Sequence, residues 1–91
     1  MIAPTIHLNG SNGERLRDQY LAIARALSEA CSKVRILEIH GRDYYVNADS
    51  DAADKAFARK QEILTDLDKY FWEIMDVTKN IQDQLNQRSK R

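Results

Sequence analysis

Apolar residues recur at alternating steps of four and three along two long stretches of the chain. The first line is Leu16, Tyr20, Ile23, Leu27, Ala30, Val34 and Leu37, and the second is Ala53, Phe57, Lys60, Leu64, Leu67, Phe71, Ile74, Thr78, Ile81 and Leu85. This spacing places the members of each line on one side of an α-helix. It predicts two amphipathic helices, over residues about 11–37 and about 51–87, that pack as an antiparallel hairpin. Charged residues off the first line, such as Arg17, are expected to face solvent.

Turn and capping residues delimit the two helices. The run Asn-Gly-Ser-Asn-Gly at 9–13 is typical of a turn, and Ser11 followed by Glu14 fits a capping box at the start of the first helix. Residues 38–50 are polar and lack helical spacing, so they are expected to form a corner between the helices. Asp49, Ser50 or Asp51 is expected to cap the second helix.

An extended arm is expected at the N-terminus, over residues 1–10. Pro4 favours extended backbone, and Ile6 and Leu8 alternate with polar residues. No second stretch with this pattern is evident, so we expect the arm to pack on helices rather than join a sheet. The sequence therefore predicts a single all-α domain over residues 1–91.

The second predicted helix carries more apolar surface than one partner helix can cover. A flanking stripe adds Ala56, Ile63, Tyr70 and Val77, and apolar side chains surround the helix at Tyr70, Phe71, Trp72, Ile74 and Met75. A helix that is apolar on every side is covered on more than one side. We therefore expect a homo-oligomer built through the second helix. The alternative is a monomer in which the arm covers the remaining surface.

Composition limits the classes of partner. Fourteen basic and fourteen acidic residues cancel, whereas a general nucleic-acid binder carries a basic excess, so we do not expect nucleic acid as a partner. No apolar run reaches the length of a membrane span, no secretory signal is evident, and Cys31 is the only cysteine. These features predict a cytoplasmic protein with no membrane association.

The glycine-rich turn is the first candidate binding site. Asn9, Gly10 and Ser11 precede a helix whose first N–H groups can bind an anion, and Arg15 adds positive charge nearby. The turn lacks the Gly-Lys-Ser/Thr ending of a phosphate-binding loop, and Glu14 opposes an anion. The alternative is an ordinary turn with a helix cap.

The second candidate site is the run His40-Gly41-Arg42-Asp43-Tyr44-Tyr45. Arg42 can bind phosphate or carboxylate with two parallel hydrogen bonds, and Tyr44 and Tyr45 offer stacking faces and hydroxyls. His40 adds an imidazole. The alternative is a packed corner in which Arg42 pairs with Asp43 and a tyrosine covers the core.

Other chemistry has little support in the sequence. His7, Cys31 and His40 lack metal-ligand spacing, and no nucleophile accompanies His40 and Asp43. We therefore expect no catalytic residues, no metal and no cofactor. Lys60, in the second apolar line, is expected to extend to the edge of the interface or to reach an anion between subunits.

The chain resembles a family of small phage- and prophage-encoded helical-hairpin proteins through two segments, Thr5-Ile6-His7-Leu8-Asn9-Gly10-Ser11 and His40-Gly41-Arg42-Asp43-Tyr44-Tyr45. The resemblance implies a location in the bacterial host cell. It suggests a binding protein that sequesters a nucleotide-derived immune signal and so counteracts host defence. Asn9, Gly10, Ser11, Arg15, His40, Arg42, Tyr44 and Tyr45 would contact the ligand. The alternative is a helical module that binds a host or phage protein through the stripe around Trp72 and Met75.

Overall fold

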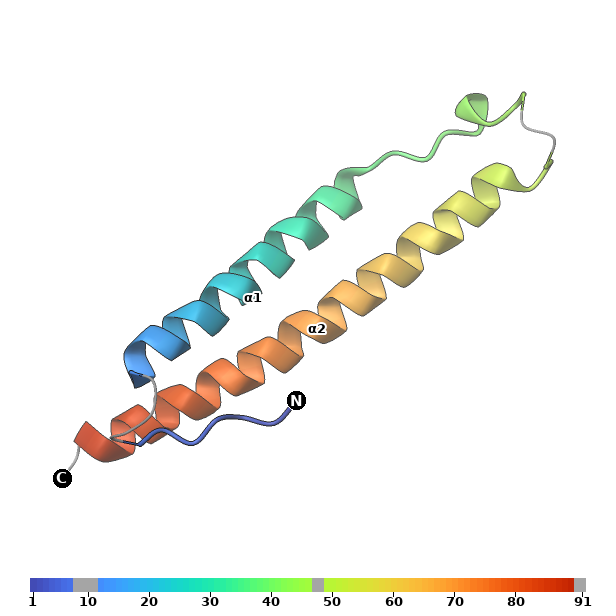
Figure 1. Ribbon diagram of the computed structural model, residues 1–91. Coiled ribbons are helices and arrows are strands. Elements are labelled where there is room, and N and C mark those ends of the chain that lie inside the picture. The colour runs from blue at the N-terminus through green and yellow to red at the C-terminus, as the bar shows by residue number, and fades with distance from the viewer. Residues whose placement is uncertain (8–11, 47–48, 90–91) are drawn as a thin grey trace.

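Two long helices form an antiparallel hairpin in the computed structural model (Figure 1). Helix α1 spans Gly13–Ile36 and helix α2 spans Ala52–Ser89, with a short 3-10 helix, η1, at Gly41–Asp43. The structure describes residues 1–7, 12–46 and 49–89. These residues form a rod whose extents are 66 × 19 × 18 Å. The prediction of a helical hairpin is confirmed, and the described residues contain no strand.

Helix α1 begins two residues later than expected because Asn12, and not Ser11, is its N-cap. The Asn12 side chain accepts a hydrogen bond from the Arg15 N–H at 2.9 Å, which satisfies one first-turn donor. The helix ends when Leu37 adopts extended backbone. At the other corner, the Asp49 carboxylate accepts from the Asp51 N–H at 2.9 Å just before α2. The Asp49 side chain thus holds the turn that leads into α2, whereas the Asp51 carbonyl accepts the first helical hydrogen bond, from the Lys55 N–H at 2.9 Å.

The line of α1 that faces α2 shares Tyr20, Leu27 and Val34 with the expected line, but at the other helical positions it passes through the residue that follows the expected one. Ala24 and Cys31 are buried, whereas Ile23 keeps 47 % of its surface exposed and Leu37 is also exposed. The packed line of α1 is Gly13, Arg17, Tyr20, Ala24, Leu27, Cys31 and Val34. Small residues at 13, 24 and 31 let the two helix backbones approach closely. The prediction that Ile23 packs inward was therefore wrong.

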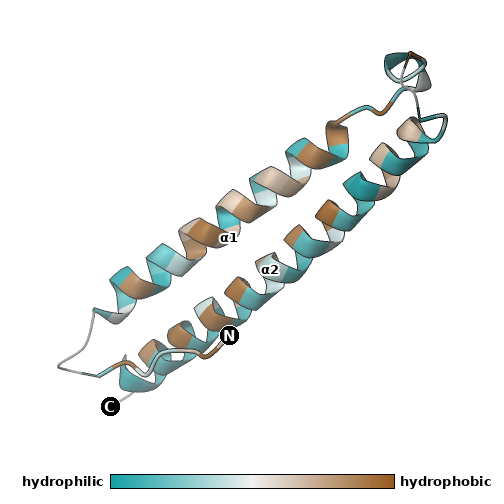
Figure 2. Ribbon diagram, turned by 45° about the vertical axis from the view of Figure 1, so that its right-hand side comes forward, coloured by the Kyte–Doolittle hydropathy of each residue, from teal (hydrophilic) through white to brown (hydrophobic). Residues whose placement is uncertain are grey.

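The packed line of α2 agrees with the sequence pattern over most of its length. Ile74, Thr78 and Ile81 are buried, and Ile81 has no exposed surface. The Thr78 hydroxyl donates to the Ile74 carbonyl at 2.9 Å, so its burial leaves no hydrogen-bonding group unsatisfied. Phe57 is the exception in this line, because it is exposed. Figure 2 shows the apolar residues recurring along both helices between polar ones.

Two charged side chains reach from one helix to the other at the edge of their interface. The Lys60 ammonium donates to the carbonyls of Arg35 at 3.0 Å and Leu37 at 2.7 Å, so it caps the C-terminal end of α1 from α2. Arg17 was expected to face solvent, but its guanidinium donates to Gln82 on α2 at 2.8 Å. Both residues use polar heads at the edge of an apolar interface, over which their aliphatic stems can pack.

Residues 1–7 lie against the C-terminal half of α2 and run in the same direction as that helix (Figure 1). The Met1 ammonium lies 3.3 Å from the Glu73 carboxylate. Further along, the Gln84 side chain accepts from the Ile6 N–H and donates to the Pro4 carbonyl, both at 2.9 Å. This segment helps to bury the second side of α2 at Val77. Neither helix, within the described residues, has a stretch apolar enough to cross a membrane.

Candidate functional site

The corner between the helices is built from an extended segment and one turn of 3-10 helix. Residues 38–40 leave α1 in a non-helical conformation, and His40 has φ −109° and ψ 133°. The Asp43 N–H then donates to the His40 carbonyl at 3.1 Å, and the Tyr44 N–H donates to the Gly41 carbonyl at 2.9 Å. These bonds hold the turn with backbone groups alone. The side chains of the turn are therefore left available for other contacts.

The surroundings of His40 in the corner favour the protonated, positively charged form of its imidazole. Its Nε2 lies 3.0 Å from the Glu38 carboxylate. The hydrogen bond to Glu38 raises the pKa of the His40 imidazole above its ordinary value, and the negative charges of Glu38 and Asp43 add to the effect. Protonated His40 therefore persists to higher pH than a free histidine would.

Arg42, Tyr45 and Val46 project into solvent at the tip of the corner. Tyr45 keeps 82 % of its surface exposed, and Val46 is almost as open. Arg42 is exposed and forms no ion pair with Asp43 or with any other described residue. Among residues 41–46, only Tyr44 is half-buried. Of the packed alternative, the Arg42–Asp43 pair does not form among the described residues, whereas the half-buried Tyr44 agrees with a tyrosine that covers the core.

The glycine-rich turn lies at the opposite end of the rod. Asn9, Gly10 and Ser11 fall outside the described residues. Arg15 is exposed and lies beside Asn12, Glu14 and Asp18 along a shallow hollow on the outer side of α1. Two carboxylates in this hollow oppose the binding of an anion.

The structure does not bring the two predicted polar motifs together within one chain. Helix α1 separates them, and 24 residues of helix span about 36 Å. Figure 1 shows the corner at one end of the hairpin and the start of α1 at the other. A site that uses both Arg15 and Arg42 of a single chain is therefore excluded by distance.

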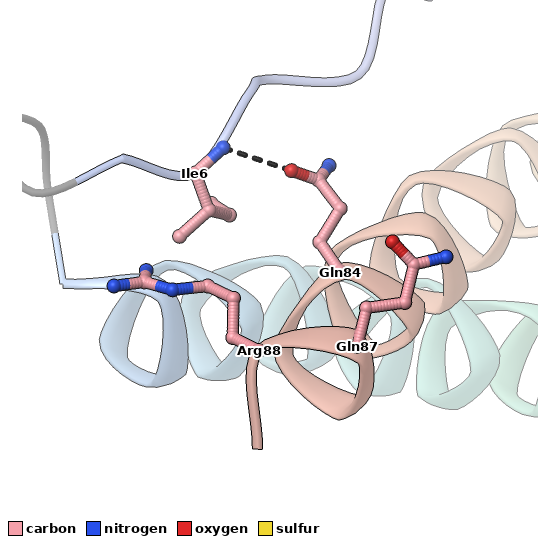
Figure 3. A pocket seen from close by; sticks show the side chains of 4 residues that line it. All are labelled: Ile6, Gln84, Gln87 and Arg88. Carbon is pink, nitrogen blue, oxygen red and sulfur yellow. Dashed lines mark hydrogen bonds between the residues drawn. The ribbon is translucent and has the colours of Figure 1, made fainter. Parts of the chain in front are cut away.

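A hollow that sequence analysis missed lies where residues 1–7 meet the end of α2. Ile6, Gln84, Gln87 and Arg88 line it, and the Gln84 amide fixes the backbone of the N-terminal segment (Figure 3). Helical spacing gave no signal for this contact because Gln84 lies outside the apolar line. Elsewhere in the described residues, no three histidine, cysteine or carboxylate side chains gather as they would around a metal ion.

Comparison with known proteins adds no relative. No family model matches the sequence, and neither a curated protein nor a solved structure is similar to the chain.

Proposed function

We propose that this chain is a non-enzymatic interaction module that recognises a host or phage protein with its corner, residues 38–46. The observation that carries the proposal is the exposure of Arg42, Tyr45 and Val46 at the tip of the rod. Arginine and tyrosine are enriched among the residues that dominate protein interfaces. An exposed valine beside them adds apolar surface that a partner protein can cover.

A small-ligand site is the second candidate, and Arg42 is the residue that favours it. Its unpaired guanidinium next to His40 suits a phosphate group. However, small-molecule sites bury most of the ligand surface, and the exposed corner of one chain offers little enclosure. Sequestration of a nucleotide-derived signal would therefore need walls from a second subunit.

We also propose that the chain works as a homo-oligomer. Within the described residues, the buried apolar side chains are few: Ala24, Cys31, Ile74, Val77 and Ile81. Such a small core stabilises a domain only marginally. Apolar residues remain exposed along both helices, among them Ile23, Ile63 and Tyr70. Their burial against another chain would supply the missing apolar contact.

The corner proposal is tested by comparing immobilised variants in capture from bacterial lysates, with and without phage infection. Arg42→Ala combined with Tyr45→Ala removes the corner side chains. Arg25→Ala is the matched control, because Arg25 is exposed on α1 away from the corner. Circular dichroism should show the same helix content in all three proteins.

A protein retained by the wild type and by Arg25→Ala, and lost from the double variant, is the expected result. Equal capture by all three proteins would refute recognition through the corner. Native mass spectrometry with cyclic dinucleotides, cyclic trinucleotides and ADP-ribose tests the second candidate. Uptake of one of these compounds that requires Arg42 would favour sequestration over protein recognition.

A further inference from the structure

Residues 37–40, which we call the extended segment, leave α1 with strand-like backbone. Leu37 has φ −63° and ψ 122°, and His40 has φ −109° and ψ 133°. The Glu38 carboxylate lies 3.0 Å from Nε2 of His40, two residues further on. Side chains two residues apart share one side of a strand, so this contact agrees with extended backbone between them. Leu37 and Ile39 then share the opposite side. Figure 1 shows the segment as the non-helical stretch between α1 and η1.

Contacts at both ends hold the extended segment in place. The Leu37 N–H donates to the Val34 carbonyl at 3.2 Å, and the Leu37 carbonyl accepts from the Lys60 ammonium of α2 at 2.7 Å. At the other end, the His40 carbonyl accepts from the Asp43 N–H at 3.1 Å. A segment that is already held in one conformation loses less entropy on binding than a free loop does.

One edge of the extended segment has no hydrogen-bonding partner. Along an extended chain, the N–H and carbonyl of one residue point to one edge, and those of the next residue point to the other. The edge that carries the Leu37 carbonyl faces α2, because Lys60 bonds this carbonyl. The opposite edge presents the Glu38 N–H, the Glu38 carbonyl and the His40 N–H. None of these three groups bonds another of the described residues.

The order of the three groups, donor, acceptor and donor, matches the edge of a second extended chain. In an antiparallel pair, Glu38 would exchange both of its hydrogen bonds with one residue of the second chain. The His40 N–H would donate to the carbonyl two residues nearer the N-terminus of that chain. A helix cannot provide this pattern, because its backbone groups are bonded within the helix.

We propose that the extended segment binds a partner protein by pairing with an extended peptide of that partner, which adds as an antiparallel strand along the open edge. This inference rests on the corner recognition proposed above and specifies which kind of structure in the partner is recognised. Backbone hydrogen bonds fix the position and direction of the added strand, and neighbouring side chains select its sequence.

Apolar side chains beside the extended segment supply contacts that the backbone bonds need. A two-stranded pair is at best marginally stable in water, so it requires an apolar side. Leu37 keeps 55 % of its surface exposed, and Ile39 is half-buried. Phe57 is also exposed and precedes Lys60 by three residues, so the two lie on the same side of α2. We expect apolar peptide residues on both sides of the residue that pairs with Glu38.

Arg42 adds a charge preference at one end of the added strand. It is exposed, lies two positions beyond His40 and forms no ion pair with any described residue. The N-terminal part of an antiparallel peptide would pass this guanidinium. An aspartate or glutamate there can accept two parallel hydrogen bonds from it. The partner peptide is therefore expected to be acidic on the N-terminal side of its apolar residues.

The extended segment of a second copy fits this edge less well. If Glu38 pairs with its own counterpart, two carboxylates lie opposite each other, which is unfavourable. If Glu38 pairs with His40 of the other copy, its N–H must bond a carbonyl that already accepts from Asp43. A different peptide avoids both costs.

Selection from a phage-displayed library of random peptides on the immobilised full chain tests the proposal. Selected peptides should alternate apolar and polar residues and carry an acidic residue N-terminal to them. The peptide that binds most tightly is then synthesised in a series with one backbone amide methylated in each member. Methylation should weaken binding at least about tenfold at every second position of the paired stretch, because only those amides point at the segment. The absence of this alternation would overturn strand addition.

Two substitutions at one position test the same pairing from the side of the protein. Glu38→Pro and Glu38→Ala both lack the carboxylate, but only proline lacks the N–H. Proline is compatible here because the preceding Leu37 is already extended. Circular dichroism should show equal helix content, and Glu38→Pro should bind the selected peptide about tenfold more weakly than Glu38→Ala. Equal affinities of the two variants would contradict a backbone hydrogen bond at Glu38.

The outcomes separate strand addition from corner recognition. Capture of a partner that requires Arg42 and Tyr45, but responds equally to Glu38→Pro and Glu38→Ala, would keep corner recognition and overturn strand addition. Capture that does not require the corner side chains would refute the proposed function itself. A wild type that selects no peptide, and that forms a dimer abolished by Glu38→Pro, would assign the edge to a second copy and overturn the proposal.

Discussion

Lys60→Met is the substitution that best tests how the two helices are joined at the corner end. It keeps an aliphatic stem of similar length and removes the ammonium that donates to Arg35 and Leu37. A hydrogen bond to a charged group contributes about 1.5–3 kcal/mol and a cation at a helix C-terminus about 0.3–1 kcal/mol, and the exposure of the Lys60 contacts to solvent lowers both values. These carbonyls can accept hydrogen bonds from water when the ammonium is absent, so the loss of stability is smaller than the sum of the two contributions. We expect the free energy of unfolding of the variant to be about 1–1.5 kcal/mol lower than that of the wild type.

Urea unfolding followed by far-UV circular dichroism, at one fixed protein concentration, measures this loss. The denaturation slope should be unchanged, because the substitution does not alter the surface that unfolding exposes. In thermal unfolding the midpoint should fall by about 5–10 °C for a chain of this size. Lys79→Met is the control, since Lys79 is exposed on the same helix and has no partner among the described residues. The control should stay within about 0.5 kcal/mol of the wild type. Equal stabilities for the two variants would refute a capping role for Lys60.

Three further predictions follow from other contacts. Gly13→Ala should lower the free energy of unfolding by about 1 kcal/mol or more, because the added Cβ would lie 2.7 Å from a leucine of α2. Gly41→Ala is the control. It should be nearly neutral in the same urea assay, because no atom lies within 4 Å of its added Cβ. Gln84→Ala should release the N-terminal segment, which hydrogen exchange would detect as faster exchange of its backbone amides. Glu38→Gln should lower the pKa of His40 towards its ordinary value in an NMR titration, and an unchanged pKa would exclude the hydrogen bond as its cause.

The sign of the pH dependence follows from the direction of that shift. Folding raises the pKa of His40, so the folded chain binds this proton more tightly than the unfolded chain does. The stabilisation of the corner by Glu38 is therefore fully present below the ordinary histidine pKa. It is lost as the pH rises through the raised value. Unfolding of Glu38→Gln should show a weaker dependence, because Asp43 alone then raises the pKa of His40.

The sequence pattern predicted a packed line on the first helix that passes through Ile23. The packed line in the structure passes through Ala24 instead and shares Tyr20, Leu27 and Val34 with the predicted one. The two helix backbones approach closely, and the small side chain of Ala24 fits between them, whereas the larger Ile23 stays outside the contact. Ile23 is instead left exposed on the side of the hairpin.

The spacing of apolar residues by itself determined that this chain forms two amphipathic helices and a hairpin, because a period near 3.6 allows no other regular structure. It also marked the corner as a distinct polar segment. Only the tertiary structure decided where the polar residues act. Lys60 and Arg17 find partners on the opposite helix, and Gln84 binds the backbone of residues near the N-terminus. Each of these contacts joins positions more than twenty residues apart, so no local pattern could reveal them. The length of α1 likewise holds Arg15 and Arg42 at opposite ends, a separation set by helix rise rather than by the chemistry of either motif.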